Sequence, residues 1–122
     1  MNKIFCKDIE NITLKNKNYR KVAYTHDKGM QFVLMSIRPG EEIGMEIHQH
    51  IDQFIRIESG MGELHIKKNN KIKKYKLKDG IGFIIPSKTY HNVLCTGKED
   101  LKLYTIYSKP SHEDGLVEKN KN

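Results

Sequence analysis

Residues 43–60 read IGMEIHQHIDQFIRIESG, and within this stretch His48 and His50 stand two positions apart among alternating apolar residues. Successive side chains of a β-strand point to opposite faces, so a strand across these residues directs both imidazoles to one side. Imidazole is the commonest metal ligand in proteins. The pair therefore predicts a metal site inside a sheet. A further histidine, His91, follows Pro86 later in the chain and is a candidate for the same site.

The alternation of apolar and polar residues continues along most of the chain and predicts short strands rather than helices. The expected strands are 19–24, 31–37, 43–48, 53–59, 62–67, 71–77, 81–85, 91–95 and 101–107. Turn-forming residues separate them, as at Arg38-Pro39-Gly40, Asn69-Asn70 and Lys78-Asp79-Gly80. Because no segment has a convincing 3.6-residue period, helix is expected to be minor. Strands at this spacing are typical of an all-β sandwich or barrel.

Length and composition predict one soluble domain. The chain has 122 residues, of which 30% are charged, and we expect a single domain over 1–122 with a core at 19–108 and a tail at 109–122. Its longest apolar runs are far shorter than the roughly 20 residues of a membrane-spanning helix. No secretory signal is visible at the N-terminus, and Cys6 and Cys95 do not suggest a disulfide framework. The expected location is cytoplasmic.

The net charge of +7 raises the possibility of a nucleic-acid partner. Many lysines lie in the segment 67–78, KKNNKIKKYKLK, which reads as a hairpin with Asn69-Asn70 at its turn. Lysines on such an arm also keep an edge strand from aggregating. Since no nucleic-acid-binding motif accompanies the charge, we expect no nucleic-acid partner. Attraction of a small anionic ligand stays open.

The expected strand 31–37 is apolar on both faces. Val33, Met35 and Ile37 point one way, whereas Phe32 and Leu34 point the other. A second apolar face needs a cover, because an exposed one favours aggregation. The segment around Phe54 poses the same problem. A homodimer is the simplest expected cover.

Two motifs in this chain resemble those of the cupin superfamily. The first family motif, G-x5-H-x-H-x(3,4)-E-x6-G, resembles His48-Gln49-His50 followed by Gln53 and then Gly60, and the second, G-x5-P-x-G-x2-H-x3-N, resembles Gly80, Pro86 and His91. The resemblance covers about 39–95. It implies a small single-domain cupin, whose fold is a double-stranded β-helix, a jelly-roll-like barrel.

The chain departs from these motifs at several positions. Gln53 stands where the family usually has glutamate, and only two residues separate it from His50. Gly44 is too close to His48 for the opening glycine, and Gly40 is too far. In the second motif, a lysine at position 88 and a cysteine at 95 replace the glycine and the asparagine. These departures bear on the charge of the site and on the metal it prefers.

The resemblance implies a divalent metal ion, for which Zn, Fe, Mn and Ni are candidates. The ligands that it implies are His48, His50, Gln53 and His91. Asp52 competes with Gln53 as the oxygen donor. Glu46 has the parity of the two histidines, so we expect it to face the barrel interior as a neighbour of the ligands or as the catalytic general base.

Three functions follow from the resemblance, all involving a small-molecule ligand. The first is a metal-dependent enzyme acting on a small polar or anionic metabolite, similar to the mannose-6-phosphate isomerase type, with Glu46 moving the proton. The second is a metal-dependent dioxygenase. The third is a binding or sensing module without turnover. A fold alone does not decide among these, because one fold hosts many activities.

Overall fold

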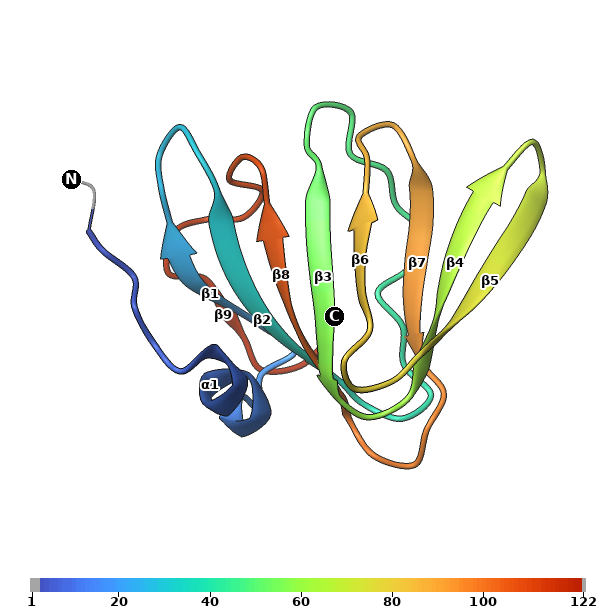
Figure 1. The fold of residues 1–122 in the computed structure, drawn as a ribbon, viewed down its shortest axis with the longest axis horizontal. Helices are drawn as coiled ribbons and strands as arrows, with labels where there is room; N and C mark the ends of the chain where they lie inside the picture. Colours follow the sequence, from blue (N-terminus) through green and yellow to red (C-terminus); the bar gives the residue numbers. More distant parts are fainter. Residues whose placement is uncertain (1–2, 122) are drawn as a thin grey trace.

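The computed structural model describes residues 3–121, which form two antiparallel sheets and one short helix (Figure 1). The larger sheet has the order β6-β3-β8-β2-β1-β9 and the smaller one β5-β4-β7. The elements are α1 (Ile9–Lys15), β1 (Arg20–Thr25), β2 (Gln31–Ile37), β3 (Gln53–Ser59), β4 (Gly62–Lys68), β5 (Lys71–Leu77), β6 (Gly82–Ile85), β7 (Tyr90–Cys95), β8 (Leu101–Tyr107) and β9 (Val117–Glu118). The predicted all-β class is confirmed. Among the described residues, no helix is long and apolar enough to cross a membrane.

One predicted strand, 43–48, is wrong. The backbone of this segment forms no ladder with β7; its bridge to β7, between Glu46 and His91, is an isolated one. Gly44 has a φ of +104°, which interrupts the extended conformation, and its N–H donates to the side chain of Asn92 on β7 rather than to a backbone carbonyl. The segment is therefore an irregular connection that runs along β7 toward β3.

The main core lies between the two sheets. It is built from the inward-facing positions of the strands, as the period of two requires. Its fully buried members include Val33, Ile57, Val93, Leu101 and Leu103. This packed layer gives the candidate site a rigid frame, because His91 lies on β7 two residues before the buried Val93.

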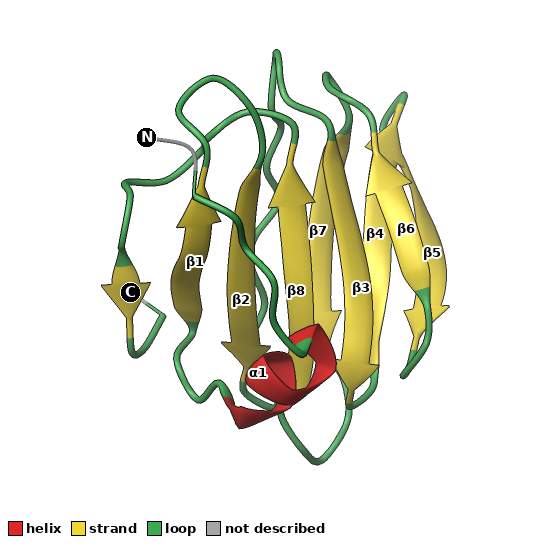
Figure 2. Ribbon diagram, turned by 60° about the vertical axis from the view of Figure 1, so that its left-hand side comes forward, coloured by secondary structure: helices red, strands yellow, loops and turns green. Residues whose placement is uncertain are grey.

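The N-terminal segment covers the outer face of β2. Figure 2 shows α1 in front of the lower ends of β8 and β3. Ile9 and Ile12 of α1 pack against a second apolar cluster that contains Phe32 and Leu34, and the ring of Phe5 lies 5.1 Å from that of Phe32. Asp8 begins the helix by accepting a hydrogen bond from the N–H of residue 11. The N-terminal segment thus covers the apolar face of β2 for which the sequence predicts a partner subunit.

The C-terminal segment returns to the same sheet. The side chain of Gln31, fully buried at the start of β2, accepts from the backbone N–H groups of Ser111 and His112 at 3.0 Å. The strand β9 then pairs with β1. These bonds place His112 next to Tyr107, whose ring centroid is 5.5 Å from that of the histidine.

Candidate metal centre

Three side chains from two parts of the chain meet in one group. Glu46 and His48 come from the connection before β3, and His91 comes from β7. Their ligand atoms lie within 4.8 Å of one another. Backbone hydrogen bonds of 2.9 Å in both directions between Glu46 and His91 fix the two segments side by side. The carboxylate therefore lies against the imidazole of His91 through a rigid backbone connection.

The two imidazoles turn their Nε2 atoms toward the carboxylate. Glu46 Oε1 is 3.5 Å from Nε2 of His48 and 3.5 Å from Nε2 of His91. These separations exceed those of a good hydrogen bond. The Nδ1 atom of His91 lies 2.8 Å from the carbonyl of Thr89, which places a proton on Nδ1 and leaves Nε2 with a free lone pair. Both features are those of a ligand set arranged around a central ion.

Buried polar atoms without a hydrogen-bond partner indicate whether a metal ion fits this group of side chains. Among the described residues, His48 Nε2, His91 Nε2 and Gln53 Oε1 are buried and accept or donate no hydrogen bond. Leaving such atoms unpaired costs about 1–3 kcal/mol each. Ligands about 2.0–2.2 Å from a metal ion are spaced about 3–3.5 Å apart. The distance of 3.5 Å from Glu46 Oε1 to each of the two Nε2 atoms agrees with that spacing. The residues present fit a divalent cation.

The Glu46 carboxylate is strongly acidic. Partial burial raises its pKa, but in the metal-free protein the adjacent imidazoles of His48 and His91, when protonated, outweigh that effect and hold the pKa at about 2. The group is therefore an anion throughout the neutral range. Such a carboxylate is well suited to bind a cation and is a weak proton acceptor.

Gln53 is fixed at the start of β3. It is 2% exposed, and its Nε2 donates to Thr105 Oγ1 at 2.9 Å, while the Thr105 hydroxyl donates to the carbonyl of Phe54. Gln53 is paired with Tyr107 on β8, so the two side chains share a face of the sheet. The ring of Tyr107 makes an edge contact with His48, at 5.7 Å between centroids. The unpaired Gln53 Oε1 thus lies on the face that carries the group.

His50 and Asp52 lie outside this group. His50 is exposed, because the backbone bends at Gln49 and ends the alternation that would have kept His50 on the side of His48. Asp52 is engaged elsewhere: its Oδ1 accepts from the N–H of Ser87 at 2.9 Å. The structure therefore brings together three of the side chains singled out in the sequence, Glu46, His48 and His91, and separates His50 from them.

The spacing of the chain agrees with this arrangement. If Glu46 takes the place of the first histidine in the family motif, the sequence reads Gly40-x5-Glu46-x-His48-x4-Gln53-x6-Gly60. Every interval then matches G-x5-H-x-H-x(3,4)-E-x6-G, including the two that failed when His48 was taken first. The signal for Glu46 was thus present in the sequence as the distances from Gly40 and Gln53.

Known proteins are similar to this chain in sequence. A family model described as "Cupin domain" matches residues 33–107. The uncharacterized protein YrkC of Bacillus subtilis (strain 168) is 39% identical over 98% of this chain, which spans 64% of the length of that relative. The uncharacterized protein L612 of Acanthamoeba polyphaga mimivirus is 40% identical, with 96% of this chain and 72% of the relative covered.

A solved structure is similar to this chain over nearly its whole length. The crystal structure of BH2720 from Bacillus halodurans superposes with a TM-score of 0.92 at 39% identity. The match covers 96% of this chain and 89% of that one. The likeness therefore extends beyond the region of the family model to the helix α1 and the returning C-terminal segment.

Proposed function

Because this chain belongs to the cupin family, we propose that it binds a divalent metal ion through Glu46, His48 and His91 and acts on a small molecule beside that ion. The observation that supports this most directly is the pair of buried, unpaired Nε2 atoms that face one carboxylate. Gln53 supplies a neutral oxygen on the same face as a further candidate ligand. This set replaces the expected one by exchanging His50 for Glu46.

The ligand chemistry favours a redox metal. Two imidazoles and one carboxylate with open positions are characteristic of non-haem Fe(II) oxygenases, so an iron-dependent dioxygenase is the reaction class we propose. When bound, the ion would supply redox and Lewis-acid chemistry at this site. The isomerase alternative needs a general base, and Glu46 is poorly suited to that role because the proposed metal ion would occupy its carboxylate. Isomerisation therefore becomes the second candidate, and ligand binding without turnover the third.

Tyr107 carries a hydroxyl group and packs against the candidate metal centre through its contact with His48. Burial raises the pKa of its phenol, so the hydroxyl keeps its proton at neutral pH. Its oxygen lies 3.3 Å from Nε2 of His112, and its ring contacts His48. We propose that Tyr107 holds the imidazole of His48 in place.

Elemental analysis tests the metal proposal directly. Protein purified without chelator and then offered Fe, Mn, Zn and Ni is expected to retain about one ion per chain at micromolar metal. Oxygen consumption by the iron-loaded protein, followed across a panel of small acids and sugars, would then separate a dioxygenase from an isomerase. A chain that remains empty with every ion would contradict the proposed function.

Metal affinity is expected to fall at low pH, because a proton competes with the metal ion at each of the two imidazole ligands, His48 and His91. Imidazoles titrate at about pH 6.5 and must be neutral to coordinate. Glu46, with a pKa of about 2, is already ionised and adds no proton competition above about pH 4. Below the imidazole range, the logarithm of the binding constant should therefore fall with a slope of about two per pH unit. Calorimetric titrations with Zn between pH 5 and 7.5 measure that slope, and a value of three would point to another imidazole ligand.

We also propose that the protein is a cytosolic homodimer. The contact would be made by an apolar surface other than the outer face of β2, which α1 covers. Phe54 is paired with Ile84 on β6 and with Ile106 on β8, so the three side chains form one row on the outer face of the sheet. Ile84 is 69% exposed, which leaves this row open to a second copy. The two free thiols, Cys6 and Cys95, suit a reducing compartment.

Light scattering is expected to give about twice the chain mass of 14.3 kDa at micromolar protein. Ile84→Lys should then convert the dimer to a monomer, because a lysine in the row would be buried without a partner. Ile72→Lys is the matched control, since Ile72 is an exposed apolar residue on β5, away from this row. A wild-type protein of single-chain mass would contradict the dimer.

A further inference from the structure

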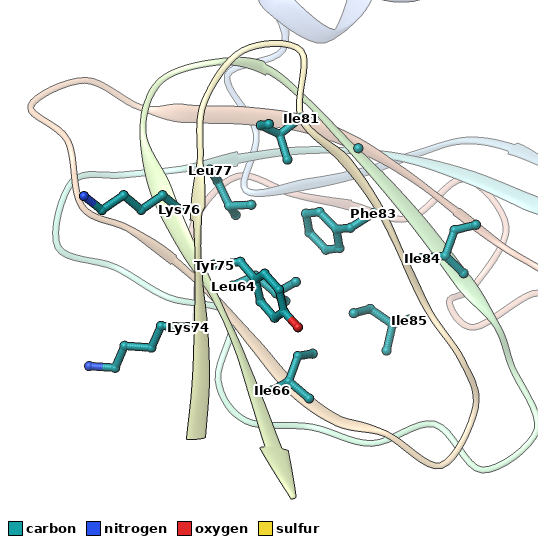
Figure 3. Close-up of a pocket in the computed structure, with 11 residues that line it drawn as sticks. Leu64, Ile66, Lys74, Tyr75, Lys76, Leu77, Ile81, Phe83, Ile84 and Ile85 are labelled. Atoms are coloured by element: carbon teal, nitrogen blue, oxygen red, sulfur yellow. The ribbon is translucent and has the colours of Figure 1, made fainter. Parts of the chain in front are cut away.

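A cavity of about 640 Å³ lies between β5 of the smaller sheet and β6 of the larger one. The side chains that line it are mostly apolar. They include Leu64, Ile66, Leu77, Ile81, Phe83 and Ile85. Figure 3 shows Phe83, Ile85 and Tyr75 around one shared space, whereas Lys74 and Lys76 extend away from it.

Two of these residues connect the cavity to the candidate metal centre. Ile66 on β4 is the strand partner of His91, and Ile85 on β6 is the strand partner of Gln53. Side chains of partners in an antiparallel pair share a face, with Cβ atoms about 4.5–5.5 Å apart. A molecule in the cavity therefore lies one side chain away from the proposed metal ligands.

The cavity offers few polar groups to a ligand. Of the described side chains that line it, only Tyr75 directs a hydroxyl toward the interior, and Tyr75 is 42% exposed at the opening. A sugar phosphate placed here would bury several hydroxyl groups without partners, each at a cost of about 1–3 kcal/mol. Apolar walls with few polar groups instead select an apolar body.

A cation lies over the ring of Tyr75, one of the residues that line the cavity. Nζ of Lys73 is 5.1 Å from the centroid of the Tyr75 ring. Lys73 is paired with Ile66, which is paired with His91, so the three residues form one row across β5, β4 and β7. Two interstrand spacings of about 4.8 Å place the ends of this row roughly 10 Å apart. The row thus has a positive charge at one end, an apolar centre and the candidate metal site at the other end.

We infer that this cavity binds the apolar body of a small aromatic or branched aliphatic carboxylic acid, with its carboxylate at Lys73 and its far end at the metal centre. This substrate class deepens the proposed function and rests on it for the reaction. The binding step requires only the cavity and Lys73. An excess of positive charge over the whole chain favours the approach of such an anion.

Amide chemical-shift titrations of the metal-free protein test the inference with three probes. 3-Phenylpropanoate carries both the apolar body and the charge, 3-phenylpropan-1-ol only the body, and mannose 6-phosphate only the charge. We expect 3-phenylpropanoate to bind at least about tenfold more tightly than mannose 6-phosphate, because only the former buries apolar surface. The alcohol should bind about threefold more weakly than the acid, the usual effect of one exposed ion pair.

Variants separate the two parts of the site. Phe83→Ser should weaken the acid and the alcohol alike, by about tenfold. Lys73→Gln should weaken only the acid. Ile72→Asn is the control, because this exposed residue of β5 lies outside the cavity lining, and it should change neither affinity. If Phe83→Ser does not fold, Tyr75→Ser at the exposed opening serves the same purpose.

Tighter binding of mannose 6-phosphate than of 3-phenylpropanoate would overturn the inference. So would shifts that leave β4, β5 and β6 unaffected, or equal effects of Ile72→Asn and Phe83→Ser. If the acid binds in the cavity while elemental analysis finds no metal, the inference on the cavity stands and the proposed function fails. The two failures are therefore distinguishable.

Discussion

His91→Ala is expected to lower the affinity for Zn and Mn by at least about 100-fold, which removes binding at micromolar metal. His91 is the most buried of the three proposed ligands, and its Nδ1 contact with the Thr89 carbonyl holds Nε2 toward the carboxylate. Alanine leaves no donor atom that could replace Nε2. Calorimetric titration of both ions into the wild type and the variant measures the loss.

His50→Ala is the matched control. This histidine is exposed and lies outside the group formed by Glu46, His48 and His91, so its removal should leave the affinity within about twofold of wild type. His48→Ala should behave like His91→Ala. A His50 variant that loses the metal as fully as the His91 variant would show that the proposed ligand set is wrong.

The side of the chain on which His48 lies could be predicted from the sequence, but that of His50 could not. Parity on a strand predicted that Glu46, His48 and His50 share one side, and the structure places the first two together. The prediction for His50 depended on an extended backbone, but the chain bends at Gln49. The intervals from Gly40 to Glu46 and from His48 to Gln53 contained the information that parity lacked.

More of the fold than of the candidate site could be predicted from the sequence. The bounds predicted for β2, β3, β5 and β8 agree with the structure, because alternating burial leaves a period of two in the sequence. The helix α1 was missed, since seven residues are too few to establish a helical period. The packing of α1 over Phe32 is a tertiary contact, which the pattern of apolar and polar residues does not predict.

The row from Lys73 through Ile66 to His91 could not be predicted for a related reason. It depends on the registers of two strand pairs, and each register is set by the turns and by the packing of the whole core. The lysine-rich sequence of the β4–β5 hairpin predicts a solvated arm. In the structure, the ammonium group of Lys73 lies over the ring of Tyr75, which lines a cavity that adjoins the candidate metal centre.

Gln53→Glu is expected to make the metal-free protein less stable and to make metal binding tighter. At pH 7 the new carboxylate would be buried at a position that is 2% exposed, with no cationic side chain bonded to it in the metal-free protein, which should cost about 2–4 kcal/mol of unfolding free energy. It would also lose the hydrogen bond that Gln53 Nε2 donates to Thr105. A bound cation would offset the charge, so Mn should bind at least about tenfold more tightly than to the wild type.

Burial of the new carboxyl group determines how the stability loss of Gln53→Glu changes with pH. A buried carboxyl has a folded-state pKa above the roughly 4.3 of an unfolded glutamate, so the loss of stability should be full at pH 7 and should shrink toward pH 4 as the group is protonated. Urea unfolding of the metal-free variant at both values measures this change. Asp52→Asn is the control, because an amide oxygen can still accept the bond from the Ser87 N–H, and Mn affinity should not change. If Asp52→Asn weakened Mn binding while Gln53→Glu left it unaltered, the oxygen donor would be Asp52, and the shift of the motif onto Glu46, His48 and Gln53 would be refuted.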